Sequence, residues 1–90
     1  MVTIIENYAR VQGVVKSVKA NDKVAGYHQI EFQLQESEDV QSYPNLAKAD
    51  EGKVIKINLT NEQLKDHKPK RNQVFSTTVR KAKGLVYFMR

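Results

Sequence analysis

Residues 53–63, KVIKINLTNEQ, join the pattern of a strand directly to the start of a helix. Apolar side chains fall at every second position of the strand, as in a sheet with one buried face: Ile55, Ile57 and Leu59. Thr60 and Gln63 then have the spacing of a capping box, in which each side chain hydrogen-bonds the other residue's backbone N–H. Because Pro69 disfavours helical backbone at the residue before it, we expect a helix of about two turns near 61–67.

Alternating runs of the same kind occur on both sides of this junction. The clearest is 27–35, which places apolar residues on one face and glutamine or glutamate on the other. His28 lies on the apolar face, where we expect a strand-end residue with a hydrogen-bonded ring and not a ligand or a base. Residues 82–84 are expected to join the last two strands as a tight hairpin. The expected strands cover residues 8–19, 27–35, 53–59, 73–81 and 85–89.

Two departures from regular alternation stand out. Gly13 lies inside the first run, where a glycine indicates a bulge or a bend. The alternation therefore leaves open whether Val14 or Val15 faces the core. Residues 36–52 are acidic at their start and end at a glycine, so we expect a long connection with a helical turn around 46–49. Connections of this length are often functional or mobile.

The order of these elements is that of a small all-β barrel formed by a single domain, residues 1–90. A long bent strand, a second strand, the long connection, a third strand, a short helix and a final strand pair follow one another. This order is similar to the OB-fold, a five-stranded Greek-key barrel, here with one short helix between strands 3 and 4. An SH3-like barrel also has five short strands, but it does not usually place a capped helix there. The expected core consists of Val11, Ile30, Phe32, Leu34, Ile55, Ile57, Leu59 and Leu64.

Within this arrangement, residues 54–63 resemble the third strand and the following turn of the small single-stranded-DNA-binding proteins of filamentous phages. The length of 90 residues also agrees with that family. The resemblance implies a phage or mobile-element protein that binds single-stranded nucleic acid, with DNA favoured over RNA. In OB-folds, the outer faces of strands one to three and the loops joining strands 1–2 and 4–5 form the binding surface.

Charge is unevenly distributed along the chain. Residues 1–60 carry 7 basic and 8 acidic side chains, a net charge of −1, whereas residues 61–90 carry 8 basic and 2 acidic ones, a net charge of +6. Together they give the overall net charge of +5. A basic segment on a small domain favours a polyanionic partner, most often nucleic acid. The alternative interpretation is a soluble surface that happens to be basic.

Several classes of function lack their sequence signals. The absence of cysteine excludes disulfides, thiol catalysis and thiolate metal sites, and two histidines are too few for a structural zinc site. The sequence has no nucleophile elbow, P-loop, dinucleotide-binding glycine motif or metal-ligand spacing. We therefore expect a non-enzymatic protein without cofactor or metal. With no apolar run of membrane-spanning length and no secretory signal, we expect a cytoplasmic protein away from membranes.

Nine residues map onto the binding surface that the OB-fold resemblance implies. They are Arg10, Lys16, Tyr27 and Lys56 on the strand faces, Lys19 and Lys23 in the first loop, and Arg80, Lys81 and Lys83 in the final hairpin. Phosphates require a row of cations, and the bases of a single strand require exposed rings on which to stack. Gln29, Gln33 and Asn58 are hydrogen-bonding neighbours. Each lysine taken singly is also typical of a solvated surface, so the prediction depends on their convergence.

The aromatic residues divide into two groups. Tyr43 in the long connection joins Tyr27 as a candidate for stacking, whereas the three phenylalanines are expected in the core: Phe32, Phe75 and Phe88. For Tyr8 and Tyr87 both positions remain open. The few exposed rings therefore predict limited stacking.

Two functions remain open on this basis. The first is a small OB module that binds single-stranded nucleic acid by neutralising phosphates, although Glu31 on the same face opposes this. The basic cluster 67–71 lies at the far pole of an OB-fold, where it extends the electrostatic footprint, contacts a protein or complements the helix dipole. The second function is a non-enzymatic protein-interaction barrel, an accessory subunit of a phage or mobile-element complex that uses a sheet edge or the acidic segment 36–51. A homodimer is compatible with either.

Overall fold

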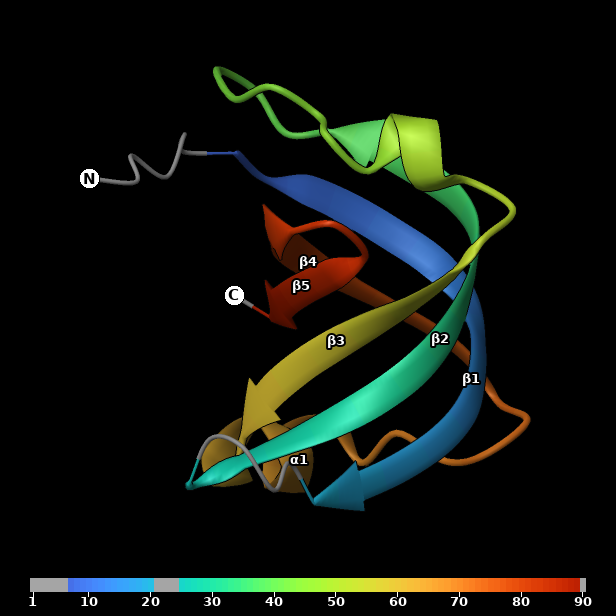
Figure 1. Cartoon of the computed structure of the whole chain (residues 1–90), viewed down its shortest axis with the longest axis vertical. Helices are drawn as coiled ribbons and strands as arrows, with labels where there is room; N and C mark the ends of the chain where they lie inside the picture. Colours follow the sequence, from blue (N-terminus) through green and yellow to red (C-terminus); the bar gives the residue numbers. More distant parts are fainter. Residues whose placement is uncertain (1–6, 21–24, 90) are drawn as a thin grey trace.

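The protein forms a closed barrel of five strands with one short helix between the third and fourth (Figure 1). The computed structural model describes residues 7–20 and 25–89. The elements in chain order are β1 (Ala9–Ala20), β2 (Tyr27–Asp39), η1 (Lys48–Asp50), β3 (Val54–Thr60), α1 (Asn61–His67), β4 (Val74–Lys83) and β5 (Val86–Met89). The strand order around the barrel is β1-β2-β3-β5-β4, with β4 pairing back onto β1, and only β3 and β5 run parallel. The expected fold class is confirmed.

The barrel closes because β1 is bent. Its whole length pairs with β2, but only Ala9 to Val14 also pairs with β4, and the β1–β2 register shifts after Gln12 and again after Val15. A Cβ atom on Gly13 would lie 2.0 Å from the carbonyl oxygen of Gln33, so the approach of β1 to β2 requires glycine there. Val15 is fully buried, which answers the question that the alternation left open.

The core matches the sequence prediction with one qualification. Seven of the eight expected residues are fully buried, and Leu64 packs against them while partly exposed. Six further residues complete the core: Ala9, Val15, Ala47, Val79, Tyr87 and Met89. Phe32 contacts the partly buried Phe75 edge-on. The expectation for Phe88 was wrong, because its side chain is half-buried beside Tyr27 and outside the core.

Each end of the barrel is covered by a different segment. Helix α1 covers one end, and the connection that contains η1 covers the other (Figure 1). The predicted capping box is present, since Thr60 Oγ1 accepts from the Gln63 N–H at 3.1 Å and Gln63 Oε1 accepts from the Thr60 N–H at 2.8 Å. Gln63 Nε2 also donates to the carbonyl of Met89 at 3.2 Å, which ties α1 to β5.

Two predicted boundaries differ from the structure. Strand β2 continues to Asp39, so the acidic residues at the start of segment 36–52 lie in the sheet and not in a loop. The reason is the length of β1, whose first half continues to pair with β2 as far as that residue. The tight turn of the last hairpin is Gly84 and Leu85, because Lys83 still pairs with Val86.

Candidate functional site

A row of outward-facing side chains crosses all five strands of the barrel. Cross-strand pairing sets Lys19 opposite Gln29, Gln29 opposite Asn58, Asn58 opposite Phe88 and Phe88 opposite Arg80. Opposed residues in a sheet have Cβ atoms about 5 Å apart, so neighbours in this row are within contact distance. The register therefore connects a lysine on β1 to an arginine on β4 through an amide pair and an aromatic ring. We call this set the first row.

A second row runs beside the first on the same outer face. Ser17, Glu31, Lys56 and Val86 oppose one another across β1, β2, β3 and β5, and the backbone of Lys83 on β4 pairs with Val86. The exposed Lys16 precedes Ser17 at the second irregularity of β1. In this row the acidic Glu31 lies between Ser17 and the cation Lys56.

Glu31 is also the link between the two rows. Its carboxylate lies 3.4 Å from the ammonium of Lys19, and both side chains are well exposed. Lys56 is its direct cross-strand partner. An exposed pair of this kind contributes little to stability. The outer face therefore holds a surplus of cations around one carboxylate.

The aromatic part of the face is built around Phe88. The edge of Tyr27 meets its ring at a centroid distance of 5.8 Å and an interplanar angle of 89°. The guanidinium carbon of Arg80 lies 5.6 Å from the ring centroid, within the range of a cation–π contact. All three side chains are partly exposed. Phe88 thus holds a second ring and a cation together at the surface.

Asn58 has a structural role that its sequence position does not suggest. It is buried although Val54 and Lys56, on the same face of β3, are exposed. Its Oδ1 accepts from Gln29 Nε2 at 3.2 Å, and its Nδ2 donates to the carbonyl of Tyr87 at 3.3 Å. These bonds fasten β2, β3 and β5 below the aromatic group, so that the first row is held in register.

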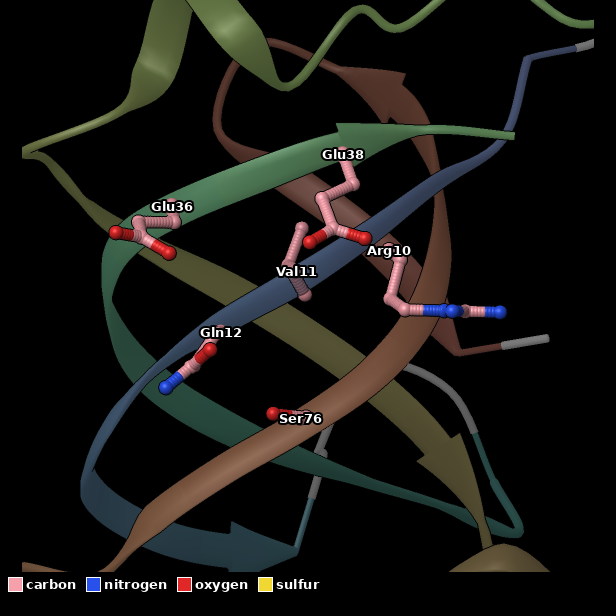
Figure 2. A pocket seen from close by; sticks show the side chains of 6 residues that line it. All are labelled: Arg10, Val11, Gln12, Glu36, Glu38 and Ser76. Carbon is pink, nitrogen blue, oxygen red and sulfur yellow. The ribbon is translucent and has the colours of Figure 1, made fainter. Parts of the chain in front are cut away.

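Arg10 lies on the other half of β1, among carboxylates. It opposes Glu38 across β2, and Gln12 opposes Glu36. Figure 2 shows these side chains around a small depression lined by Arg10, Val11, Gln12, Glu36, Glu38 and Ser76. Six residues of strand separate Arg10 from Lys16, a distance of about 20 Å at ~3.3 Å per residue. The structure does not bring Arg10 together with the other predicted site residues.

Lys81 points to the end of the barrel that the η1 connection covers. Its ammonium lies 2.8 Å from Oδ2 of Asp50, a side chain that is only 6% exposed. The hydroxyl of Tyr87 donates to the same oxygen, and the ammonium of Lys53 lies 3.6 Å from Oδ1. Lys81 is therefore held by an internal ion pair, whereas its neighbour Arg80 belongs to the outer face.

The charge state of this cluster follows from its contacts. Burial by itself raises the pKa of Asp50, but the hydrogen bonds from Lys81 and Tyr87 outweigh it and leave that pKa below its ordinary value. Burial, together with the bond to Asp50, raises the pKa of Tyr87. At neutral pH a carboxylate, an ammonium and a neutral phenol thus meet here. The cluster ties the η1 connection to β4 and β5.

A second contact fastens the same connection to β2. The carboxylate of Glu51 accepts from the backbone N–H of Ser37 at 2.8 Å and from its hydroxyl at 3.0 Å. These bonds lower the pKa of Glu51. Asp50 and Glu51 therefore both fasten the η1 connection over this end of the barrel.

The structure thus sorts the predicted site residues into three groups. Five share the outer face of the two rows: Lys16, Lys19, Tyr27, Lys56 and Arg80. Arg10 and Lys81 lie elsewhere, as described above. Lys23 and the side chain of Lys83 lie outside the described residues. Tyr43 meets Tyr8 edge-on at a centroid distance of 4.4 Å, near the start of β1 and away from the rows.

In the part of the chain that the structure describes, no group of three or more His, Cys, Asp or Glu residues is arranged to hold a metal ion. No helix among residues 7–20 and 25–89 is long and apolar enough to cross a membrane. No protein family, curated protein or solved structure matches this chain.

Proposed function

We propose that this protein binds single-stranded nucleic acid, with DNA favoured, on the outer face formed by the two rows. The observation that carries the proposal is the group of Tyr27, Phe88 and Arg80, which lies in register with Lys19 and beside Lys56. A single strand offers phosphates and the faces of its bases, and this surface offers cations and aromatic rings within a few ångströms of each other. The similarity of residues 54–63 to phage single-stranded-DNA-binding proteins supports the choice of DNA.

In this proposal, the groups on this face make different kinds of contact with the bound strand. Arg80 is already placed by Phe88, so little side-chain freedom is lost when it binds a phosphate. Because Arg80 lies over Phe88, Tyr27 is the ring on which a base stacks. Lys16, Lys19 and Lys56 extend the cations across β1 to β3. Asn58 acts through its neighbours by fixing the register beneath them.

Fluorescence anisotropy with a labelled oligothymidylate, titrated over a range of salt concentrations, tests the proposal. We expect affinity to fall steeply with salt, with a slope of about 0.7 in log–log form for each phosphate contact to a single strand. Arg80→Gln should lower that slope by about 0.7, the value for one phosphate contact. Tyr27→Ala should weaken binding by ~1–3 kcal/mol and leave the slope unchanged, because stacking is not ionic.

Lys48→Gln provides the matched control, since Lys48 is exposed on η1 at the other end of the barrel. It removes the same formal charge as Arg80→Gln. Equal losses from the two variants would mean diffuse attraction to a basic protein and would contradict a site on the rows.

The competing proposal, a protein-interaction barrel, is favoured by a different observation. Val74 is 60% exposed, and Val54 and Leu85 are also well exposed. The depression in Figure 2 carries two carboxylates, which suits a protein partner better than a polyanion. If the wild-type protein binds no oligonucleotide even at low salt, this second function is to be preferred.

A further inference from the structure

A second basic surface lies on the segment that follows α1. Four cations there are exposed: Lys65, Lys68, Lys70 and Arg71. With Asp66 as the acidic residue within 65–71, their formal net charge is +4 − 1 = +3. The sequence predicts the part of this surface at 67–71 at the pole away from the groove.

The structure places the end of this segment directly against β1. The N–H of Asn72 donates to the carbonyl of Val15 at 2.7 Å, and the N–H of Val15 donates to the carbonyl of Gln73 at 3.0 Å. Val15 immediately precedes Lys16, the exposed cation at the β1 end of the second row. In Figure 1 the segment between α1 and β4 accordingly runs beside the lower half of β1. The cluster therefore adjoins the outer face and is not remote from it.

The cations are presented by a turn of defined shape. The N–H of Gln73 donates to the carbonyl of Lys70 at 3.1 Å, which closes a turn with Arg71 and Asn72 at its centre. Asn72 has a φ of 67°, a conformation that asparagine tolerates better than most residues. Pro69, just before the turn, is buried and anchors it to the barrel. Lys70 and Arg71 are thus exposed on backbone that is already ordered.

The route from the rows to this turn crosses the edge of β1. Strand β4 pairs with β1 as far as Val14, and Asn72 and Gln73 continue that contact to Val15. From Ser17 onward, β1 has β2 as its paired strand within the described chain. Adjacent strands are about 4.8 Å apart, which puts Lys56 on β3 about 10 Å from β1 and about 15 Å from the turn. One OB-like domain contacts ~4–16 nucleotides, so a bound strand is long enough to reach it.

We propose that a bound single strand continues from the outer face over β1 at Lys16 and onto the turn, where Lys70 and Arg71 bind its phosphates. This inference rests on the proposed function and adds a direction and a length to it. Short oligonucleotides occupy the rows alone, whereas long ones also engage the turn.

Anisotropy titrations with two oligothymidylates, of about 5 and about 15 nucleotides, test this extension. The variant is Lys70→Gln with Arg71→Gln, and Asn72 is left intact to preserve the turn. Two lost phosphate contacts should weaken binding of the long oligonucleotide about 25-fold at 0.1 M salt, or ~5-fold for each contact, and reduce its salt slope by about 1.4. Binding of the short oligonucleotide should change less than about twofold.

Lys48→Gln with Lys53→Gln removes the same formal charge at the opposite end of the barrel, where Lys48 lies on η1 and Lys53 beside Asp50, and should leave the long oligonucleotide nearly unaffected. Circular dichroism checks that both variants remain folded. An equal loss for both lengths, or no loss for the long one, overturns the extension and leaves the proposed function standing. If neither oligonucleotide binds the wild-type protein, the proposed function and the extension both fail.

Discussion

Replacing Gly13 by alanine should damage the barrel more than its small volume suggests. An added Cβ would lie 2.0 Å from the carbonyl oxygen of Gln33 and 3.0 Å from a ring carbon of Phe32. Because a Cβ contact shorter than 3.0 Å is essentially never tolerated, the oxygen would have to withdraw by about 1 Å, the difference between 3.0 and 2.0. That oxygen belongs to the backbone of β2 and cannot rotate away as a side chain does.

Overpacking of a close-packed region usually costs ~1–3 kcal/mol, so we expect a loss of about 3 kcal/mol or more for Gly13→Ala. The whole domain has about 5–13 kcal/mol of stability if it follows the usual 0.05–0.15 kcal/mol per residue. Urea unfolding followed by circular dichroism measures the loss. Gly52→Ala is the matched control, because an added Cβ at Gly52 would have no atom within 4 Å. The backbone φ of Gly52 is 88°. Its left-handed backbone should cost only about 1–2 kcal/mol. If Gly13→Ala loses no more stability than Gly52→Ala, the close approach of β1 to β2 is wrong.

Three further predictions follow from the core, the buried cluster and the outer face. Phe32→Ala should lower the free energy of unfolding by ~3–5 kcal/mol, because the ring is fully buried, and a thermal midpoint within a few degrees of wild type would contradict this. Asp50 has a depressed pKa, so the stability it contributes is present above its ordinary value of 3.8 and is lost as the pH falls through its lower folded-state pKa. Asp50→Asn should remove that part of the acid sensitivity, so its urea midpoint should fall less than that of the wild type between about pH 7 and about pH 3. An equal fall in the two proteins would count against this role of Asp50. On the proposed function, Glu31→Gln should tighten oligonucleotide binding, up to about 5-fold if Lys19 then takes one more phosphate, and weaker binding would argue that Glu31 orders the face.

Local patterns were sufficient for most of the fold. The capping box at Thr60 and Gln63 forms as its spacing predicts, and α1 has the expected bounds. Alternation in β2 and β3 identified six buried residues because each of those strands has one apolar and one polar face. Where both faces of a strand are apolar, alternation does not show which face is buried. In β5 we expected Phe88 in the core and left Tyr87 open, but the pairing with β3 and β4 buries Tyr87 and turns Phe88 outward.

The position of Lys81 had a local signal, whereas its partner did not. Lys81 follows Val79 by two residues, so both side chains belong to the inner face of β4. Asp50 lies 31 residues earlier in an irregular connection, and no spacing in the sequence predicts its contacts with Lys81 and Tyr87. The same holds for the turn at Lys70, because its position depends on two backbone bonds to Val15. Contacts of this kind appear only when the barrel has closed.

The bend in β1 also separates opposite charges along one strand pair. Before Gly13, Arg10 and Gln12 face Glu38 and Glu36; after it, Lys16 and Lys19 lie beside a single carboxylate. On the proposed function, a polyanion that reaches β1 from the aromatic group meets repulsion from the two glutamates in one direction. On the other side of β1, where β4 pairs, it meets the cations of the turn. That turn is hydrogen-bonded to Val15 through Asn72, and it carries no competing carboxylate between Lys68 and Gln73. On the proposed extension, repulsion by the acidic half of the strand pair favours the route toward Lys70 and Arg71. Removing the carboxylates at 36 and 38 should therefore lengthen the footprint along β1 without strengthening the contact at the turn.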